Sequence, residues 1–222
     1  MTQQPTRPDV AADDADPLAA SAGPDNGQIT RPLILQTALT IIDRDGADSL
    51  SMRRLSEAVG RDPAVLYRHV PNKAAVLDGV AEIVLEQLTV NTADPDWAGQ
   101  LRTVAHDFRR LALAHPNVVA LLVTRPLATP LGQRPPGTLR HLEDVLALLT
   151  CAGFTGDDAL HIYRVLFAYL YGHVITEFPL VRALAPALAS YEGAAELDRG
   201  LDLLIPSLAS TLPRADGSAR TR

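Results

Sequence analysis

The sequence has little cysteine, few aromatic residues and no long uninterrupted hydrophobic run. Cys151 is the only cysteine among 222 residues, so neither an internal disulfide framework nor a cysteine-rich zinc site can be built. The most apolar stretch is interrupted by Arg164, His173 and Glu177, which excludes a membrane span there. A basic start followed by an apolar run, the pattern of an export signal, is also missing. We therefore expect a cytoplasmic protein without a membrane partner.

Positive charge is also scarce, since 20 lysines and arginines face 26 aspartates and glutamates for a net charge of −6. This balance argues against a nucleic-acid partner, because DNA affinity comes largely from cations that neutralise phosphates. Most of the excess lies in residues 1–27, where Arg7 stands against five aspartates. The segment is rich in Ala, Asp and Pro and has no apolar period, so we expect a disordered acidic leader.

A short basic segment lies inside this acidic chain. Between residues 51 and 73 five cations stand against Glu57 and Asp62, which gives a local net charge of +3. The cations are Arg53, Arg54, Arg61, Arg68 and Lys73, with His69 among them. The overall charge therefore does not exclude a nucleic-acid partner.

Apolar residues recur every three or four positions through most of the chain, which is typical of helices, and strand patterns are absent. We therefore predict an all-α fold with a first domain at residues 28–90. Capping residues and Gly or Pro breakers predict its helices at 30–46, 51–60, 64–70 and 73–88.

A second, larger helical domain is predicted at residues 91–210, followed by a polar tail at 211–222 that we expect to be disordered. Its helices are predicted at 97–115, 139–149, 157–178 and 194–210, with Pro206 kinking or ending the last one. Residues 125–137 contain four prolines and are predicted to be a loop. The helix at 157–178 is apolar nearly all round, so we expect it to be buried on more than one side.

The predicted helices at 51–60 and 64–70, joined at Gly60, have the helix-turn-helix pattern. Leu66 and Val70 would face the core. Small apolar side chains can touch thymine methyls, arginine can pair with guanine, and tyrosine, histidine and lysine can hold phosphates. The alternative is a solvated helix with a few cations. The side chains left outside the core are Ala64, Val65, Tyr67 and Arg68, with His69 and Lys73 at the end.

Residues 49–80, SLSMRRLSEAVGRDPAVLYRHVPNKAAVLDGV, resemble the DNA-binding domain of the Tet-repressor (TetR) family of transcription regulators. The turn, the LYRHV motif and the following Asn-Lys stand at the family's spacing. Residues 97–108, the Thr124-Arg125-Pro126 step and GFTGDDALHIYRVLF from Gly153 look like the C-terminal domain of the tetracycline-repressor branch. The resemblance implies a homodimer that binds double-stranded operator DNA and responds to a small-molecule effector. We expect the two apolar helices at 157–178 and 194–210 to form the interface of that homodimer.

The resemblance also implies roles for single positions. Arg53 matches a residue that reaches a base edge, while Ala64 and Tyr67 match contacts to bases and backbone. Tyr67, His69 and Lys73 match phosphate contacts. Arg68 replaces an aromatic residue, which we expect to alter operator preference. For Arg53 and Lys73 the alternative is a solvated charge. The predicted DNA-binding residues are Arg53, Ala64, Val65, Tyr67, Arg68, His69 and Lys73.

The family's effector pocket implies a second set of residues, namely Val104, Phe108, Leu121, Thr124 and Arg125. Val104 and Leu121 stand where the tetracycline repressor has a polar amide and a magnesium-binding histidine, and Thr89 replaces another histidine. We therefore expect a more apolar effector than a magnesium–tetracycline complex, and no metal or other cofactor. For Val104 and Phe108 a place in the core is an equal alternative.

Two further positions carry expectations of their own. His173 and Glu177 stand four residues apart, but no third metal ligand is evident, so we predict a polar pair at a helix-packing surface. Cys151 is predicted to pack at an apolar helix end.

The sequence as a whole predicts a DNA-binding transcriptional regulator, a repressor released from a near-palindromic operator by a small, largely apolar effector. One alternative is an all-helical enzyme that uses the cavity of the second domain, and another is a ligand-independent DNA-binding protein. We expect no enzyme, because the sequence has no G-x-S-x-G, G-x-G-x-x-G, phosphate-loop or H-E-x-x-H motif.

Overall fold

The computed structural model describes residues 29–124, 140–178 and 192–210, and within these ranges it contains helices and no strand. The all-α prediction is confirmed. The predicted leader, the proline-rich loop and the polar tail lie outside the described residues. The first domain consists of α1 (Arg31–Asp45), the short η1 (Ala47–Ser49), α2 (Met52–Val59), α3 (Pro63–Tyr67) and α4 (Lys73–Leu85). The second contains α5 (Trp97–Ala114), α6 (Pro116–Thr124), α7 (Arg140–Cys151), α8 (Gly156–Glu177) and α10 (Gly193–Ala209).

Capping residues set the starts of the helices in the first domain. The side-chain oxygens of Thr30, Ser51, Asp62 and Asn72 each accept a hydrogen bond from a backbone N–H in the first turn of the helix that follows. At the end of α2, Gly60 has a φ of +71°, in the left-handed region that glycine adopts without strain. The chain can therefore reverse within a few residues between α2 and α3.

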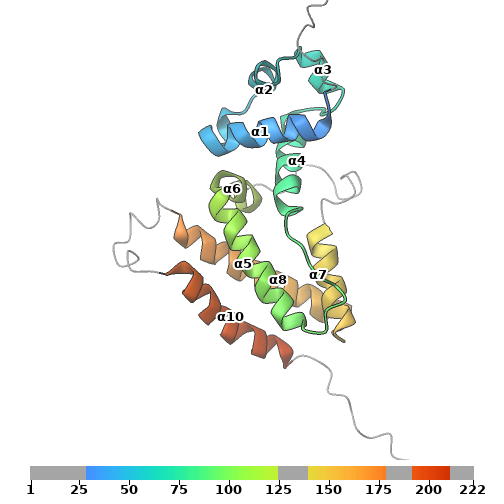
Figure 1. The fold of residues 1–222 in the computed structure, drawn as a ribbon, viewed down its shortest axis with the longest axis vertical. Helices are drawn as coiled ribbons and strands as arrows, with labels where there is room; N and C mark the ends of the chain where they lie inside the picture. The colour runs from blue at the N-terminus through green and yellow to red at the C-terminus, as the bar shows by residue number, and fades with distance from the viewer. Residues whose placement is uncertain (1–28, 125–139, 179–191, 211–222) are drawn as a thin grey trace, which may run out of the picture.

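The core of the first domain lies between α1 and the helices that surround it. Figure 1 shows α1 crossing the upper part of α4, with α2 and α3 on the outer side of α1. Helices α1 and α4 approach closely at Gly79, where an added Cβ would lie 2.7 Å from a methyl group of Leu35. The fully buried side chains here include Ile34, Ile42, Leu55, Leu66, Val76 and Val80. Each contributes about 1.5–3 kcal/mol by leaving water.

The second domain is a helical bundle in which α8 packs against α5, α7 and α10 (Figure 1). Phe108 of α5 lies near its centre. The Phe108 ring makes edge-to-face contacts with Phe167 and Tyr171 of α8, at ring-centre distances of 5.6 and 5.1 Å. Other buried side chains are Leu101, Leu148, Leu149, Ile162, Leu166, Leu170, Leu197 and Leu201.

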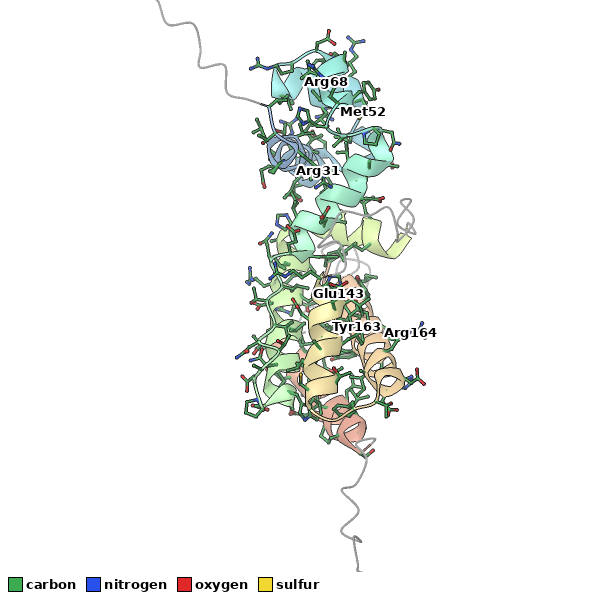
Figure 2. All side chains as sticks on the ribbon, turned by 90° about the vertical axis from the view of Figure 1, so that its right-hand side faces the viewer. Arg31, Met52, Arg68, Glu143, Tyr163 and Arg164 are labelled. Carbon is green, nitrogen blue, oxygen red and sulfur yellow. The ribbon has the colours of Figure 1, made fainter. Side chains whose placement is uncertain are left out.

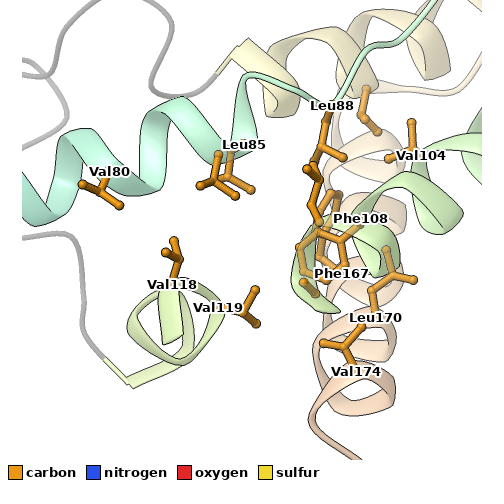
Figure 3. Packing of buried hydrophobic residues seen from close by; sticks show 14 of the residues in the cluster. Val80, Leu85, Leu88, Val104, Phe108, Val118, Val119, Phe167, Leu170 and Val174 are labelled. Atoms are coloured by element: carbon orange, nitrogen blue, oxygen red, sulfur yellow. The ribbon is translucent and has the colours of Figure 1, made fainter. Parts of the chain in front are cut away.

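Helix α6 joins the two domains. Figure 3 shows its buried residues Val118 and Val119 below Val80 and Leu85 of α4, with Val119 on the side toward Phe108. Helix α6 also packs against α1. Because protein interiors are close-packed, a displacement of α6 would also move the elements of the first domain that it contacts, namely α1, η1 and α4.

Several predicted boundaries differ from the structure. Helix α3 ends at Tyr67 and α4 at Leu85, each three residues earlier than expected. The segment before Thr124 is the helix α6, which the apolar pattern did not predict. Pro206 lies inside α10 without ending it, because the carbonyl that it leaves unbonded belongs to the solvent-exposed Asp202.

Cys151 is exposed, so the prediction that it packs at an apolar helix end is wrong. It is the last residue of α7 and lies beyond the buried pair Leu148 and Leu149.

Candidate nucleic-acid interface

The turn between α2 and α3 is held by backbone and side-chain hydrogen bonds. The N–H of Gly60 donates to the carbonyl of Glu57 at 3.2 Å, and the N–H of Arg61 donates to that of Ser56 at 3.0 Å. Oδ1 of Asp62 then accepts from the N–H of Ala64 at 2.8 Å and starts α3. These contacts fix the angle between the two helices, as a helix-turn-helix requires.

Leu66 and Val70 anchor the α3 segment to the core. Their exposed fractions are 0 % and 1 %. The prediction that these two residues face inward is confirmed. Because these two side chains point into the core, the side chains on the opposite face of α3 point toward solvent.

The outer face of α3 is open to solvent. Ala64, Tyr67 and Arg68 are exposed, and Val65 and His69 are half-buried. Tyr67 is 50 % exposed, which is unusual for a large aromatic residue. Figure 2 shows Arg68 at the outer end of the first domain, far from Tyr163 and Arg164 of the second. Of the side chains predicted to read bases, Ala64, Tyr67 and Arg68 are therefore accessible to solvent, and Val65 is accessible in part.

Lys73 begins α4 beside this surface and is half-buried. Oδ1 of Asn72 accepts from the N–H of Ala75 at 2.9 Å and fixes the start of the helix. A lysine next to the N–H groups of a helix N-terminus is suited to a phosphate.

The two adjacent arginines of α2 differ in their surroundings. The Arg53 side chain is 88 % exposed, and its Nε donates to Oε1 of Glu57 at 2.9 Å. Arg54 is 34 % exposed, pairs with Asp45 at the end of α1 and donates to the carbonyl of Ser49. Arg54 therefore ties α2 to α1, a role that its sequence neighbourhood did not indicate.

The side chains predicted to approach an effector are distributed over α5 and α6. Val104 and Phe108 are buried, with exposed fractions of 1 % and 2 %, and Leu121 is half-buried on α6. Thr124 ends α6, but its side chain and Arg125 lie outside the described residues. Val104, Phe108 and Leu121 all belong to or pack against the hydrophobic core.

A partly buried polar contact that the sequence did not reveal lies beside Phe167. Nε2 of His141 is 3.0 Å from the hydroxyl of Tyr163. Burial lowers the pKa of His141 to about 4, raises that of Tyr163 and raises that of Tyr171 to about 12. These groups are therefore neutral near pH 7. In the sequence, the one indication that His141 is buried is that it lies four residues before the apolar Val145, on the same face of the helix.

A second polar network links α5, α8 and α10. Arg109 donates from Nε and Nη2 to the two carboxylate oxygens of Glu177, at 2.8 and 2.6 Å. Nε2 of His173 lies 2.8 Å from Oε1 of Glu177 and 2.9 Å from the carbonyl of Gly193. The predicted polar pair of His173 and Glu177 is thus confirmed, and Arg109 is a partner that the sequence did not reveal.

The described residues contain no group of three side chains placed to hold a metal ion. None of their helices is long and apolar enough to cross a membrane.

Two family models match the chain. Residues 34–80 match "Bacterial regulatory proteins, tetR family", and residues 91–216 match "Tetracyclin repressor-like, C-terminal domain". The matches meet near the boundary between the first and second domains.

Individual proteins are similar over most of the chain. An HTH-type transcriptional regulator of Saccharopolyspora erythraea is 32% identical over 204 residues, which cover 87% of this chain and 81% of that protein. The tetracycline repressor protein class C of Escherichia coli is 32% identical over 84% of this chain and 77% of its own length. The structure of ActR from Streptomyces coelicolor in complex with actinorhodin superposes with a TM-score of 0.69, at 27% identity over 85% of this chain and 99% of that one.

Proposed function

This chain belongs to the TetR family of bacterial regulatory proteins, and we propose that it represses transcription by binding a near-palindromic operator from which a small, largely apolar effector releases it. It is a transcriptional regulator with an N-terminal helix-turn-helix domain. We place it in the cytoplasm and assign it no catalytic activity, since its relatives are transcriptional regulators.

The observation that carries this proposal is the accessible face of α3, held outward by the buried Leu66 and Val70. A short helix anchored in this way can enter the major groove, where each base pair presents a distinct pattern of donors and acceptors. The net charge of +3 in residues 51–73 supplies the attraction to phosphates. The excess acidic charge elsewhere would limit non-specific binding.

Each residue of this surface has a proposed task that follows from its chemistry. Arg53 and Arg68 are exposed and can pair with guanine edges. Ala64 and Val65 are small enough to touch thymine methyls. We assign the phosphate contacts to three side chains at the flank of α3, namely Tyr67, His69 and Lys73.

We further propose that α8 and α10 form the interface of a homodimer. Leu203 of α10 is 75% exposed, the largest exposed fraction among the large apolar side chains of the described residues. On α8, Ala168 and Gly172 are exposed, and a Cβ added at Gly172 would meet nothing within 4 Å. These small residues would let a second copy approach closely, and a two-fold dimer matches a palindromic operator.

We propose that the effector site lies among α5, α6 and α8 and includes Val104, Phe108 and Leu121. The predicted contacts of the Thr124 side chain and of Arg125 lie outside the described residues. The apolar character of Val104 and Leu121 supports an effector that is itself largely apolar. The neutral His141–Tyr163 pair would offer it polar atoms without charge. That ActR was solved in complex with actinorhodin supports a small-molecule effector in this chain.

A ligand-independent DNA-binding protein is the second candidate, and the near-complete burial of Val104 and Phe108 favours it. One experiment separates the two. DNA flanking the protein's own gene is footprinted while candidate metabolites are titrated. A protected palindrome that is lost with one metabolite supports the first proposal. Protection that no metabolite changes supports the second, and absence of protection contradicts both.

A further inference from the structure

We propose that Glu57 is a positioning residue for base recognition, which holds the guanidinium of Arg53 in one orientation toward a guanine. This inference rests on the proposed function, which assigns Arg53 to a base edge. Glu57 does not itself contact the base. It acts by orienting Arg53.

The contact between the two side chains leaves the reading end of Arg53 available. Oε1 of Glu57 accepts from Nε of Arg53 at 2.9 Å, so the bond does not use the two terminal nitrogens Nη1 and Nη2. A guanidinium that is fixed through Nε can present both terminal nitrogens to the O6 and N7 acceptors of one guanine.

Helix electrostatics do not account for this pair. Arg53 is the second residue of α2, close to the positive end of the helix dipole, where a cation is unfavourable. Its neighbour Arg54 is also a cation, although Arg54 is paired with Asp45. The order of arginine before glutamate is also the less stabilising one at this spacing. The cation at position 53 is therefore better explained by something that it binds outside the helix.

The pair borders a hollow of about 510 Å³ between α2 and the start of α3. The hollow opens beside Pro63, so Arg53 and Glu57 face the same space as the first turn of the proposed recognition helix. Its lining is Arg53, Ser56, Glu57, Gly60, Arg61, Asp62 and Pro63. A base edge that meets α3 would thus lie within reach of Arg53.

The carboxylate of Glu57 has two opposite effects on DNA. Its negative charge weakens attraction to phosphates at every sequence. Its bond to Arg53 favours the one sequence that places a guanine at the fixed guanidinium. Glu57 therefore lowers overall affinity and raises discrimination between sequences, whereas an ordinary surface carboxylate would do only the first.

The test compares Glu57→Ala, which removes the acceptor, with Glu57→Gln, which keeps an acceptor oxygen but removes the charge. Glu143→Gln is the matched control, because Glu143 is an exposed carboxylate on α7 of the second domain (Figure 2). The wild type first selects duplexes from a 20-bp library with randomised positions. The position at which Arg53→Ala loses the preference for guanine identifies the base that Arg53 reads. Affinities of all variants are then measured on the selected duplex and on single-base variants at that position, with circular dichroism as the check on folding.

We expect both Glu57 variants to bind non-specific duplexes several-fold more tightly than the wild type. Glu57→Ala should lose about tenfold in discrimination at the Arg53 position, and Glu57→Gln should keep most of it. Equal discrimination in the wild type and both variants, or equal loss in both, would overturn the positioning role. If the wild type selects no sequence at all, the proposed function itself is contradicted instead.

Discussion

Nδ1 of His115 lies 2.8 Å from Oδ2 of Asp43, and this contact joins the end of α5 to the end of α1. Beside it, Nδ2 of Asn117 donates to the carbonyls of Ile42 and Asp43, at 2.9 and 3.2 Å. Oδ1 of Asp43 is buried and has no hydrogen-bond partner among the described residues. The two domains are therefore tied together by polar contacts as well as by the apolar packing of α6.

Replacing His115 with alanine should destabilise the protein by about 1–3 kcal/mol, because it leaves the carboxylate of Asp43 partly buried without its partner. Urea unfolding, followed by circular dichroism and by the fluorescence of Trp97, measures the change. The unfolding transitions reported by the two probes should coincide less closely than in the wild type, because the domains are less firmly joined. Thr103→Ala removes a hydroxyl bonded only within α5 and is the control. If His115→Ala lowers the free energy of unfolding no more than the control does, the His115–Asp43 contact does not hold the two domains together.

Stability should fall as the pH drops from about 6.5 to 4, and His141 should account for part of the fall. Burial lowers the pKa of His141 to about 4 from the 6.5 of the unfolded chain. Between these values the unfolded state binds a proton that the folded state does not, so acid favours unfolding. The contribution is complete above pH 6.5 and lost by pH 4, with a total of about 3 kcal/mol.

His141→Gln should flatten the dependence of the free energy of unfolding on pH in this window. His161→Gln, a change at an exposed histidine of α8, should leave the slope as it is in the wild type. Urea unfolding at several pH values measures both. A wild-type slope in His141→Gln would show that this histidine is not held neutral by burial.

Arg68→Ala and Lys73→Ala should change DNA binding in different ways. Arg68 is assigned to a base edge, so its loss should relax sequence preference at one position of each half-site. Lys73 is assigned to a phosphate, so its loss should weaken binding at all sequences and reduce the salt slope by about 0.9 per lost contact. Fluorescence anisotropy at several salt concentrations distinguishes these results. Unchanged sequence preference in Arg68→Ala together with an unchanged salt slope in Lys73→Ala would contradict both assignments.

Deletion of residues 1–27 should leave the thermal midpoint unchanged and leave DNA affinity equal or higher. The segment carries Arg7 and five aspartates, so its removal takes away negative charge that repels phosphates. Thermal unfolding and anisotropy measure the two quantities. A marked fall of the midpoint after the deletion would refute the prediction that the leader does not take part in the fold.

The sequence predicted those features that depend on local pattern. Thr30, Ser51, Asp62 and Asn72 stand at the helix starts where their side chains can cap, so the starts were predictable. The burial of Leu66 followed from its spacing to Val70. The exposure of Ala64, Tyr67 and Arg68 on α3 followed from the same spacing.

Contacts between distant segments could not be predicted in this way. His115 and Asp43 are 72 residues apart, and Arg109 and Glu177 are 68 apart, so no local spacing relates the partners. The pKa of His141 depends on burial by helices that the chain brings together only on folding. Helix α6 was missed because its apolar residues follow one another too closely to show a helical period.

The most direct test of the central claim is the ratio of affinities for an operator duplex and for a scrambled duplex of the same composition. The operator is the duplex selected from the randomised library, and both affinities are measured by competition anisotropy at one physiological salt concentration. We expect the operator to bind at least about 10³-fold more tightly than the scrambled duplex. Equal affinity for the two duplexes would contradict sequence-specific recognition by the face of α3.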